Sequence, residues 1–198
     1  MAAGVTAKLW EMSDMVKVFR GLGMHQPIIS LGFTILPRNG VYSIALAVAV
    51  GLAYGAYMAL ADSFVFHNII PPSQTALIAN YSALGRIAYF LLPVIYEEIT
   101  FRLILLTAIA WILVSLAGLR VWCFWAAIFL VALAAYPALH ITYLETLQPS
   151  TLVVLREILL HGAAGTLWGY LYWRHGLLAA MVGHLSAHLS LEPLLSVL

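Results

Sequence analysis

Charged residues are scarce in this 198-residue chain. Only 9% of the residues are charged, nine basic and eight acidic, and 64% are apolar. A soluble domain carries roughly a quarter charged residues, and a compact core of this length needs a polar surface that such a composition cannot supply. The scarcity therefore excludes a soluble globule. The net charge of +1 gives no basic field for nucleic acid, so no nucleic-acid partner is expected.

Several residue types and motifs are also missing. Cys123 is the only cysteine, so no intrachain disulfide can form. The chain has no His-Glu-x-x-His zinc helix. Its only aspartates, Asp14 and Asp62, lie outside the long apolar runs, which excludes an intramembrane aspartyl pair. Ser186 has no Gly-x-Ser-x-Gly setting, so serine–histidine hydrolysis is not expected.

Long apolar runs are what the sequence does have. A bilayer core requires about 20 apolar residues per helix, and five such runs are present. They predict an all-α fold, a polytopic membrane helical bundle of about five transmembrane helices, with residues 41–198 as the integral membrane domain and residues 83–198 as its motif-bearing core. Gly165 and Gly169, four residues apart, predict a close approach between two of these helices. The predicted spans are about Val41–Leu60, Ser82–Leu116, Val121–Ile141, Leu152–Trp173 and Leu177–Val197.

Residues 1–40 are predicted to form an amphipathic interfacial segment. Between Lys8 and Arg20 apolar side chains recur at helical spacing with charged residues on the other faces, which predicts a helix lying on the membrane surface. A disordered tail is the alternative. Most Lys and Arg residues fall on the side of the membrane that also holds the N-terminus, which predicts a cytoplasmic N-terminus.

Six ionisable residues lie inside the predicted spans, where a charge is costly and marks a partner, a cavity or a function. They are Glu97, Glu98, Arg102, His140, His184 and His188. Glu98 and Arg102 are four residues apart, in the favourable order for an ion pair on one helix face. Glu97 lies about 100° around the helix from Glu98 and is expected to keep an unpaired carboxylate, which suits a general base. Pairing of both glutamates with other helices for assembly alone is the alternative.

The histidines repeat this four-residue spacing. Tyr136 and His140 share a face near the end of the third predicted span, and His184 and His188 share a face of the fifth. Two histidines at this spacing suit two ligands of one metal ion or two donors to one oxyanion. Hydrogen bonding between helices without a catalytic role is the alternative.

Three motifs in this order resemble the CPBP family of intramembrane proteins, the CAAX proteases and bacteriocin-processing (Abi) proteins. The matching stretches are EEITFR at 97–102, YPALH at 136–140 and HLSAH at 184–188, and the resemblance covers about residue 83 to residue 198. It implies a glutamic intramembrane endopeptidase that needs no cofactor. The implied substrate is a membrane-associated peptide or protein, such as a prenylated CAAX tail, a peptide leader or a membrane anchor.

The resemblance also implies a role for each motif residue. Glu97 and His140 would activate the attacking water. His184 and His188 would hold the oxyanion of the tetrahedral intermediate. The residues that would support the site are Glu98, Arg102 and Tyr136.

Two positions depart from the family pattern. Tyr136 stands where the family usually has phenylalanine, and His188 stands where it usually has asparagine or aspartate. Because a histidine can also ligate metal, a zinc-dependent membrane metallohydrolase that uses His140, His184 and His188 stays open. So does a non-catalytic membrane scaffold or immunity protein, in which the polar network serves assembly.

Overall fold

The residues that the structure describes form a bundle of five long helices. The computed structural model describes residues 31–69, 81–140 and 150–198, and within these ranges it contains no strand, which confirms the predicted all-α class. Three of the long helices include a π-helical stretch, labelled η. In chain order the elements are α3 (Gly40–Phe64); α5 (Ala83–Glu97), η1 (Glu98–Leu106) and α6 (Thr107–Ala117); α7 (Val121–Leu130), η2 (Val131–Ala135) and α8 (Tyr136–Leu139); α10 (Thr151–Arg156), η3 (Glu157–Gly162) and α11 (Ala163–His175); and α12 (Leu177–Leu195).

The helices agree with the predicted spans to within a few residues. Gly40–Phe64, Ala83–Ala117 and Val121–Leu139 are each long and apolar enough to cross a bilayer. The helices over 151–175 and 177–195 carry more polar side chains, some of which face the interior of the bundle: Arg156 and Ser186, for example, are buried. Apolar side chains such as Leu92 and Leu116 are exposed on the outside, as expected for a surface that faces lipid. The protein is an integral membrane protein.

Hydroxyl side chains and glycines set several helix ends. Ser82, the predicted N-cap, accepts a hydrogen bond from the Gly85 amide at 3.2 Å, and Ser150 accepts one from the Val153 amide at 3.2 Å. The helix over 151–175 ends at Gly176, whose φ of +101° is a conformation that L side chains rarely adopt. The conformation of Gly176 explains why the chain can turn sharply between α11 and α12.

The segment before α3 packs against the start of α12. The Leu177 and Leu178 amides donate to the carbonyl oxygens of Thr34 and Ile35 at 2.9 and 3.0 Å, which satisfies amides that a helix start leaves open. Phe33 lies in the main apolar core. The predicted boundary at residue 40 stays a prediction. The expected interfacial helix between Lys8 and Arg20, and with it the N-terminal orientation, lies outside the described residues.

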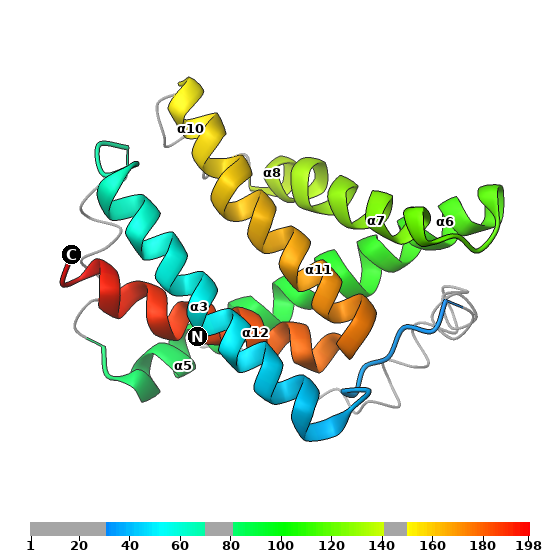
Figure 1. Ribbon diagram of the computed structural model, residues 1–198, viewed down its shortest axis with the longest axis horizontal. Coiled ribbons are helices and arrows are strands. Elements are labelled where there is room, and N and C mark those ends of the chain that lie inside the picture. The colour runs from blue at the N-terminus through cyan, green and yellow to red at the C-terminus, as the bar shows by residue number, and fades with distance from the viewer. Residues whose placement is uncertain (1–30, 70–80, 141–149) are drawn as a thin grey trace, which may run out of the picture.

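Small residues bring the helices close together. α12 crosses against α3, and the helix over 151–175 runs between α3 and the helix over 121–139 (Figure 1). Gly165 faces Ala132, where an added Cβ would lie 2.9 Å from the Ala132 Cβ, and Gly169 similarly faces Ile128, which confirms the predicted close approach. Gly51 forms a second such contact that the sequence analysis did not single out, since a Cβ there would overlap a backbone oxygen of α12.

Candidate active site

Glu98 is the centre of a buried ion-pair cluster. Its side chain is fully buried, its Oε2 lies 3.3 Å from Arg102 Nε, and its Oε1 accepts a hydrogen bond from His184 Nδ1 at 2.9 Å. Arg102 also donates to the Gly165 carbonyl oxygen at 3.4 Å. The predicted Glu98–Arg102 pair is therefore confirmed, and it ties η1 to α11 and α12.

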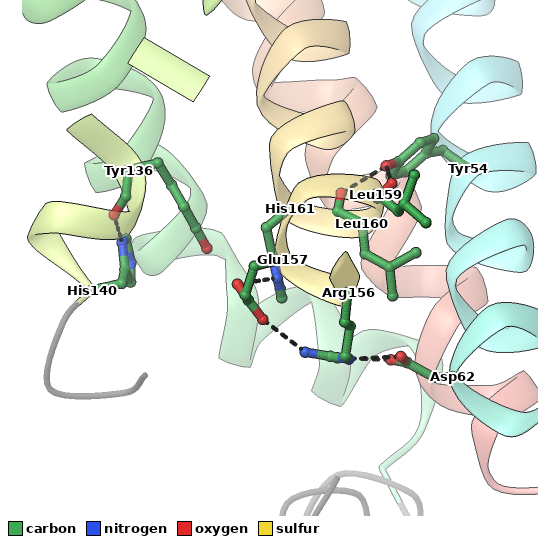
Figure 2. Close-up of polar contacts among 9 residues, drawn as sticks. All are labelled: Tyr54, Asp62, Tyr136, His140, Arg156, Glu157, Leu159, Leu160 and His161. Atoms are coloured by element: carbon green, nitrogen blue, oxygen red, sulfur yellow. Dashed lines mark hydrogen bonds and ion pairs between the residues drawn. The ribbon is translucent and has the colours of Figure 1, made fainter. Parts of the chain in front are cut away.

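Glu97 faces a different group. Its Oε1 lies 3.9 Å from Nε2 of His140, and the two side chains are 23% and 29% exposed. His140 Nδ1 donates to the Tyr136 carbonyl oxygen at 2.9 Å (Figure 2). A carbonyl only accepts, so the proton is on Nδ1, and Nε2 of a neutral His140 carries the lone pair that faces Glu97.

His184 and His188 lie side by side on α12. Their ring centroids are 5.2 Å apart, as their four-residue spacing predicted. His188 Nδ1 lies 2.9 Å from Glu192 Oε1, and its ring stacks on Phe90 at 3.9 Å. Both histidines therefore use Nδ1 to contact a carboxylate, which fixes their tautomers and leaves Nε2 for a substrate.

These side chains surround two cavities. Glu97 lines both, whereas His140 lines the cleft toward Tyr96 and Thr100, which measures about 200 Å³. The inner cavity measures about 140 Å³. It is lined by Met58, Glu97, Arg102, Tyr136, His161, Ala164, Gly165, Trp168, His184, Ala187, His188 and Leu191.

The π-helical stretches adjoin this site. Glu98 opens η1, Tyr136 directly follows η2, and His161 lies in η3. Such stretches are rare and are frequent at functional sites. The hydrophobic pattern gave no sign of them, because one extra residue in a turn changes an apolar helix's periodicity very little.

The described residues provide no ligand set for the alternative metal site. Among the residues that the structure describes, no group of three or more His, Cys, Asp or Glu side chains is arranged to hold a metal ion. His140, His184 and His188, the ligands of that alternative, are not brought together around one point. The zinc hypothesis thus receives no geometric support from the described part of the chain.

A second polar chain was missed by the sequence analysis. Asp62 makes a bidentate contact with Arg156, at 2.8 Å to both Nε and Nη2. Arg156 Nη1 lies 3.0 Å from Glu157, and the other Glu157 oxygen lies 2.7 Å from His161 Nδ1 (Figure 2). The four-residue spacing of Glu157 and His161 is the signal that would have found it.

Comparison with known proteins identifies the family. A family model described as type II CAAX prenyl endopeptidase Rce1-like matches residues 79–190, more than half of the chain and all three motifs. No curated protein and no solved structure matches the chain significantly. The family match confirms the resemblance that the motifs at 97–102, 136–140 and 184–188 predicted. The chain therefore belongs to the Rce1-like family of type II CAAX prenyl endopeptidases, which are CAAX-type intramembrane proteases.

Proposed function

We propose that this protein hydrolyses the peptide bond on the carboxyl side of the prenylated cysteine in a membrane-bound CAAX protein, with a water activated by Glu97 and His140. One observation carries the proposal. Of two adjacent glutamates, Glu98 is fully buried and held by Arg102 and His184, whereas Glu97 lies on the wall of both cavities, 3.9 Å from His140. Only Glu97 is therefore placed to exchange a proton with a bound molecule.

The 3.9 Å separation between Glu97 and His140 suits a bridging water. It is too long for a direct hydrogen bond, which needs about 2.7–3.2 Å, but one water oxygen can lie at hydrogen-bond distance from both atoms. The water would donate one proton to the Glu97 carboxylate and the other to His140 Nε2. Glu97 takes its proton as the water oxygen attacks the carbonyl carbon, and later delivers it to the leaving amine nitrogen, so the proton count balances.

In this proposal His184 stabilises the oxyanion. Because its Nδ1 proton is donated to Glu98, its Nε2 is a donor only in the imidazolium form. Glu98 and Arg102 cancel each other's charge, so an imidazolium at His184 supplies one net positive charge opposite the developing negative oxygen. Glu98 thus orients this ring and stabilises its cation in the way that a carboxylate does in a catalytic triad.

His188 is the second donor. Its ring lies 5.2 Å from the His184 ring on the same helix face, and Glu192 holds its Nδ1. With Nδ1 facing a carboxylate, the imidazolium form directs an Nε2 proton toward the cavity. The proposal thus assigns to His188 the role that the family usually gives to asparagine or aspartate.

Substitution of the base tests the proposal. The purified protein in lipid nanodiscs is incubated with a farnesylated CAAX peptide, and release of the C-terminal fragment is followed by mass spectrometry. Glu97→Gln keeps the size of the side chain but removes the base, so kcat is expected to fall at least about 100-fold. The amount of folded protein should not change, because Glu97 forms no buried ion pair with any residue that the structure describes.

The matched control is His67→Gln, compared with His140→Gln. His67 is exposed beyond the end of α3 and lines neither cavity, so its replacement should leave kcat unchanged, whereas His140→Gln should lower it. Wild-type rates with Glu97→Gln in folded protein would refute the proposed mechanism. Absence of cleavage by the wild-type protein would refute the proposed substrate.

A further inference from the structure

Positive charge gathers at one end of the helix bundle, which we call the basic end. α3 starts and α11 ends there (Figure 1). The exposed arginines of the described residues all lie at this end: Arg38 precedes α3, Arg120 precedes α7 and Arg174 lies in the last turn of α11. The acidic side chains of the described residues lie toward the other end or in the candidate active site; they are Asp62, Glu97, Glu98, Glu157 and Glu192. The basic end therefore holds no described carboxylate that could neutralise these arginines.

Arg38 and Arg174 are held next to each other by the backbone. The Arg38 amide donates to the His175 carbonyl oxygen at 3.2 Å, and Arg174 is the residue before His175 in α11. His175 is fixed in turn, since its Nδ1 lies 3.1 Å from the hydroxyl oxygen of Ser43. Both guanidinium groups act electrostatically on the His175 ring. Because like charges held this close repel each other, an anion bound by both arginines would lower the electrostatic energy.

The start of α3 adds to this positive field. α3 begins at Gly40, directly after Asn39, and the Asn39 side chain forms no capping hydrogen bond. The first turn of α3 holds no acidic residue. A helix start carries a partial positive charge and open amides, which phosphate oxygens commonly satisfy. The two arginines and the helix start beside them therefore favour the same ligand chemistry, that of a phosphate group.

Aromatic rings place this group at the level of the lipid headgroups. The Arg174 guanidinium lies 5.4 Å from the centroid of the Trp173 ring, and the Tyr42 ring, 63% exposed, lies 6.3 Å from the His175 ring. Tryptophan and tyrosine are enriched where the membrane meets water, and the phosphates there belong to phospholipids. A zwitterionic phospholipid also carries an ammonium group, which the two arginines would repel. An anionic phospholipid such as phosphatidylglycerol carries none.

We propose that Arg38 and Arg174 bind the phosphate group of an anionic phospholipid. The bound phosphate bridges the segment before α3 and the end of α11, so it stabilises the contact between these two parts of the chain. Neither arginine lines the two cavities of the candidate active site. The inference therefore does not depend on the proposed function.

Native mass spectrometry measures this binding directly. The purified protein in detergent is mixed with equal amounts of phosphatidylglycerol and phosphatidylcholine that have the same acyl chains, and the bound lipids are identified by mass. We expect the wild type to bind phosphatidylglycerol preferentially. Arg174→Gln should lower the preference about fivefold, which corresponds to the roughly 1 kcal/mol that one basic residue contributes near an anionic membrane. Combination with Arg38→Gln should bring the preference close to one.

Arg120→Gln is the matched control. Arg120 lies at the same end, since Phe124 of α7 stacks on Trp173 with 4.9 Å between ring centroids. It is exposed and its replacement removes the same charge, but the described charges that act on His175 are those of Arg38 and Arg174. Arg120→Gln should therefore keep the wild-type preference within about twofold.

Two further variants separate loss of charge from loss of structure. Arg174→Lys keeps the charge and should keep most of the preference. Arg38→Gln also removes a hydrogen bond to the Gly32 carbonyl oxygen, whereas the Arg174 side chain lies on the Trp173 ring. Arg174→Gln thus tests the site without breaking the contact between Arg38 and Gly32.

Thermal unfolding gives a second readout. Because the lipid binds the folded protein, phosphatidylglycerol should raise the wild-type Tm more than phosphatidylcholine does. This difference should vanish in the variant that combines Arg38→Gln and Arg174→Gln. Inorganic phosphate at the same concentration should not reproduce the stabilisation, because it lacks the acyl chains that hold a lipid against the bundle.

Four results would overturn the inference. Equal binding of the two lipids by the wild type, or an unchanged preference in the folded double variant, would show that the two arginines select no anionic lipid. A loss in Arg120→Gln as large as that in Arg174→Gln would assign the binding to the overall charge of the basic end. Equal stabilisation by inorganic phosphate would assign the site to free phosphate instead of a lipid.

Discussion

Replacing Glu98 by glutamine is expected to destabilise the fold, although its neighbour Glu97 is the proposed base. Glu98 is fully buried and contacts Arg102 at 3.3 Å and His184 at 2.9 Å. The substitution keeps the shape but removes the negative charge, so the Arg102 guanidinium, 3% exposed, loses its only carboxylate among the described residues. The Gly165 carbonyl at 3.4 Å is a neutral acceptor and replaces little of this stabilisation.

The size of the effect follows from the burial. Breaking a buried ion pair by removing one partner costs about 3–5 kcal/mol, because the other charge stays buried and uncompensated. For a chain of this length each 1 kcal/mol corresponds to about 2–4 °C in Tm, so a decrease on the order of 10 °C is expected. In the assay, each variant is heated in the same detergent, and unfolding is measured as the loss of the monodisperse peak in size-exclusion chromatography.

Two controls make the result decisive. Glu97→Gln should shift Tm by less than about 2 °C, since Glu97 is partly exposed and its contact with His140, at 3.9 Å and also partly exposed, contributes little. Glu98→Gln combined with Arg102→Met should be less destabilised than the sum of the two single variants, because the pair is removed together. A Glu98→Gln protein as stable as the wild type, or a Glu97→Gln protein that loses more stability, would contradict the assignment of the two glutamates.

Two further substitutions test the packing and the oxyanion role. Gly51→Ala should lower Tm by several degrees, because the added methyl group would overlap the Gly183 carbonyl oxygen where α3 crosses α12. Gly85→Ala should not lower Tm, because a methyl group there, in the first turn of α5, would make only ordinary contacts. Equal effects of the two substitutions would contradict the packing. His184→Gln should lower kcat about 100-fold and change KM by less than about threefold, since the substitution removes a donor needed in the transition state. Steady-state kinetics measure both constants. A raised KM at unchanged kcat would assign His184 to substrate binding instead.

Local spacing in the sequence was enough to predict the contacts within each helix. The four-residue rule gave the Glu98–Arg102 pair and the neighbouring rings of His184 and His188. The same rule separated Glu97 from Glu98, and the structure directs Glu97 toward His140. Apolar run length gave the five helices, because a bilayer selects for length and hydropathy more strictly than an aqueous core does.

Contacts between helices could not be predicted from residue spacing within one helix. The hydrogen bond from His184 to Glu98 joins residues 86 positions apart, and the Asp62–Arg156 contact joins residues 94 positions apart. Asp62 was considered only as a residue outside the apolar runs, yet it is 3% exposed and contacts Arg156, which in turn contacts Glu157. Which charges meet depends on the crossing of helices, and the pattern within one helix does not encode it.

The two adjacent glutamates show how one helix can supply both a buried support and the proposed base. Successive residues on a helix point about 100° apart, so Glu98 can enter the interior while Glu97 stays at the wall between the two cavities. An arginine one turn later neutralises only the glutamate on its own face. The buried pair then holds His184. The Glu97 carboxylate lies at the wall of the two cavities, 3.9 Å from His140 Nε2, where the proposed mechanism requires it. A Glu-x-Glu spacing would put the two carboxylates on nearly opposite faces of the helix, so they could not both lie beside the same cavity. The proposed chemistry therefore depends on the adjacency of the two glutamates, and not only on their presence.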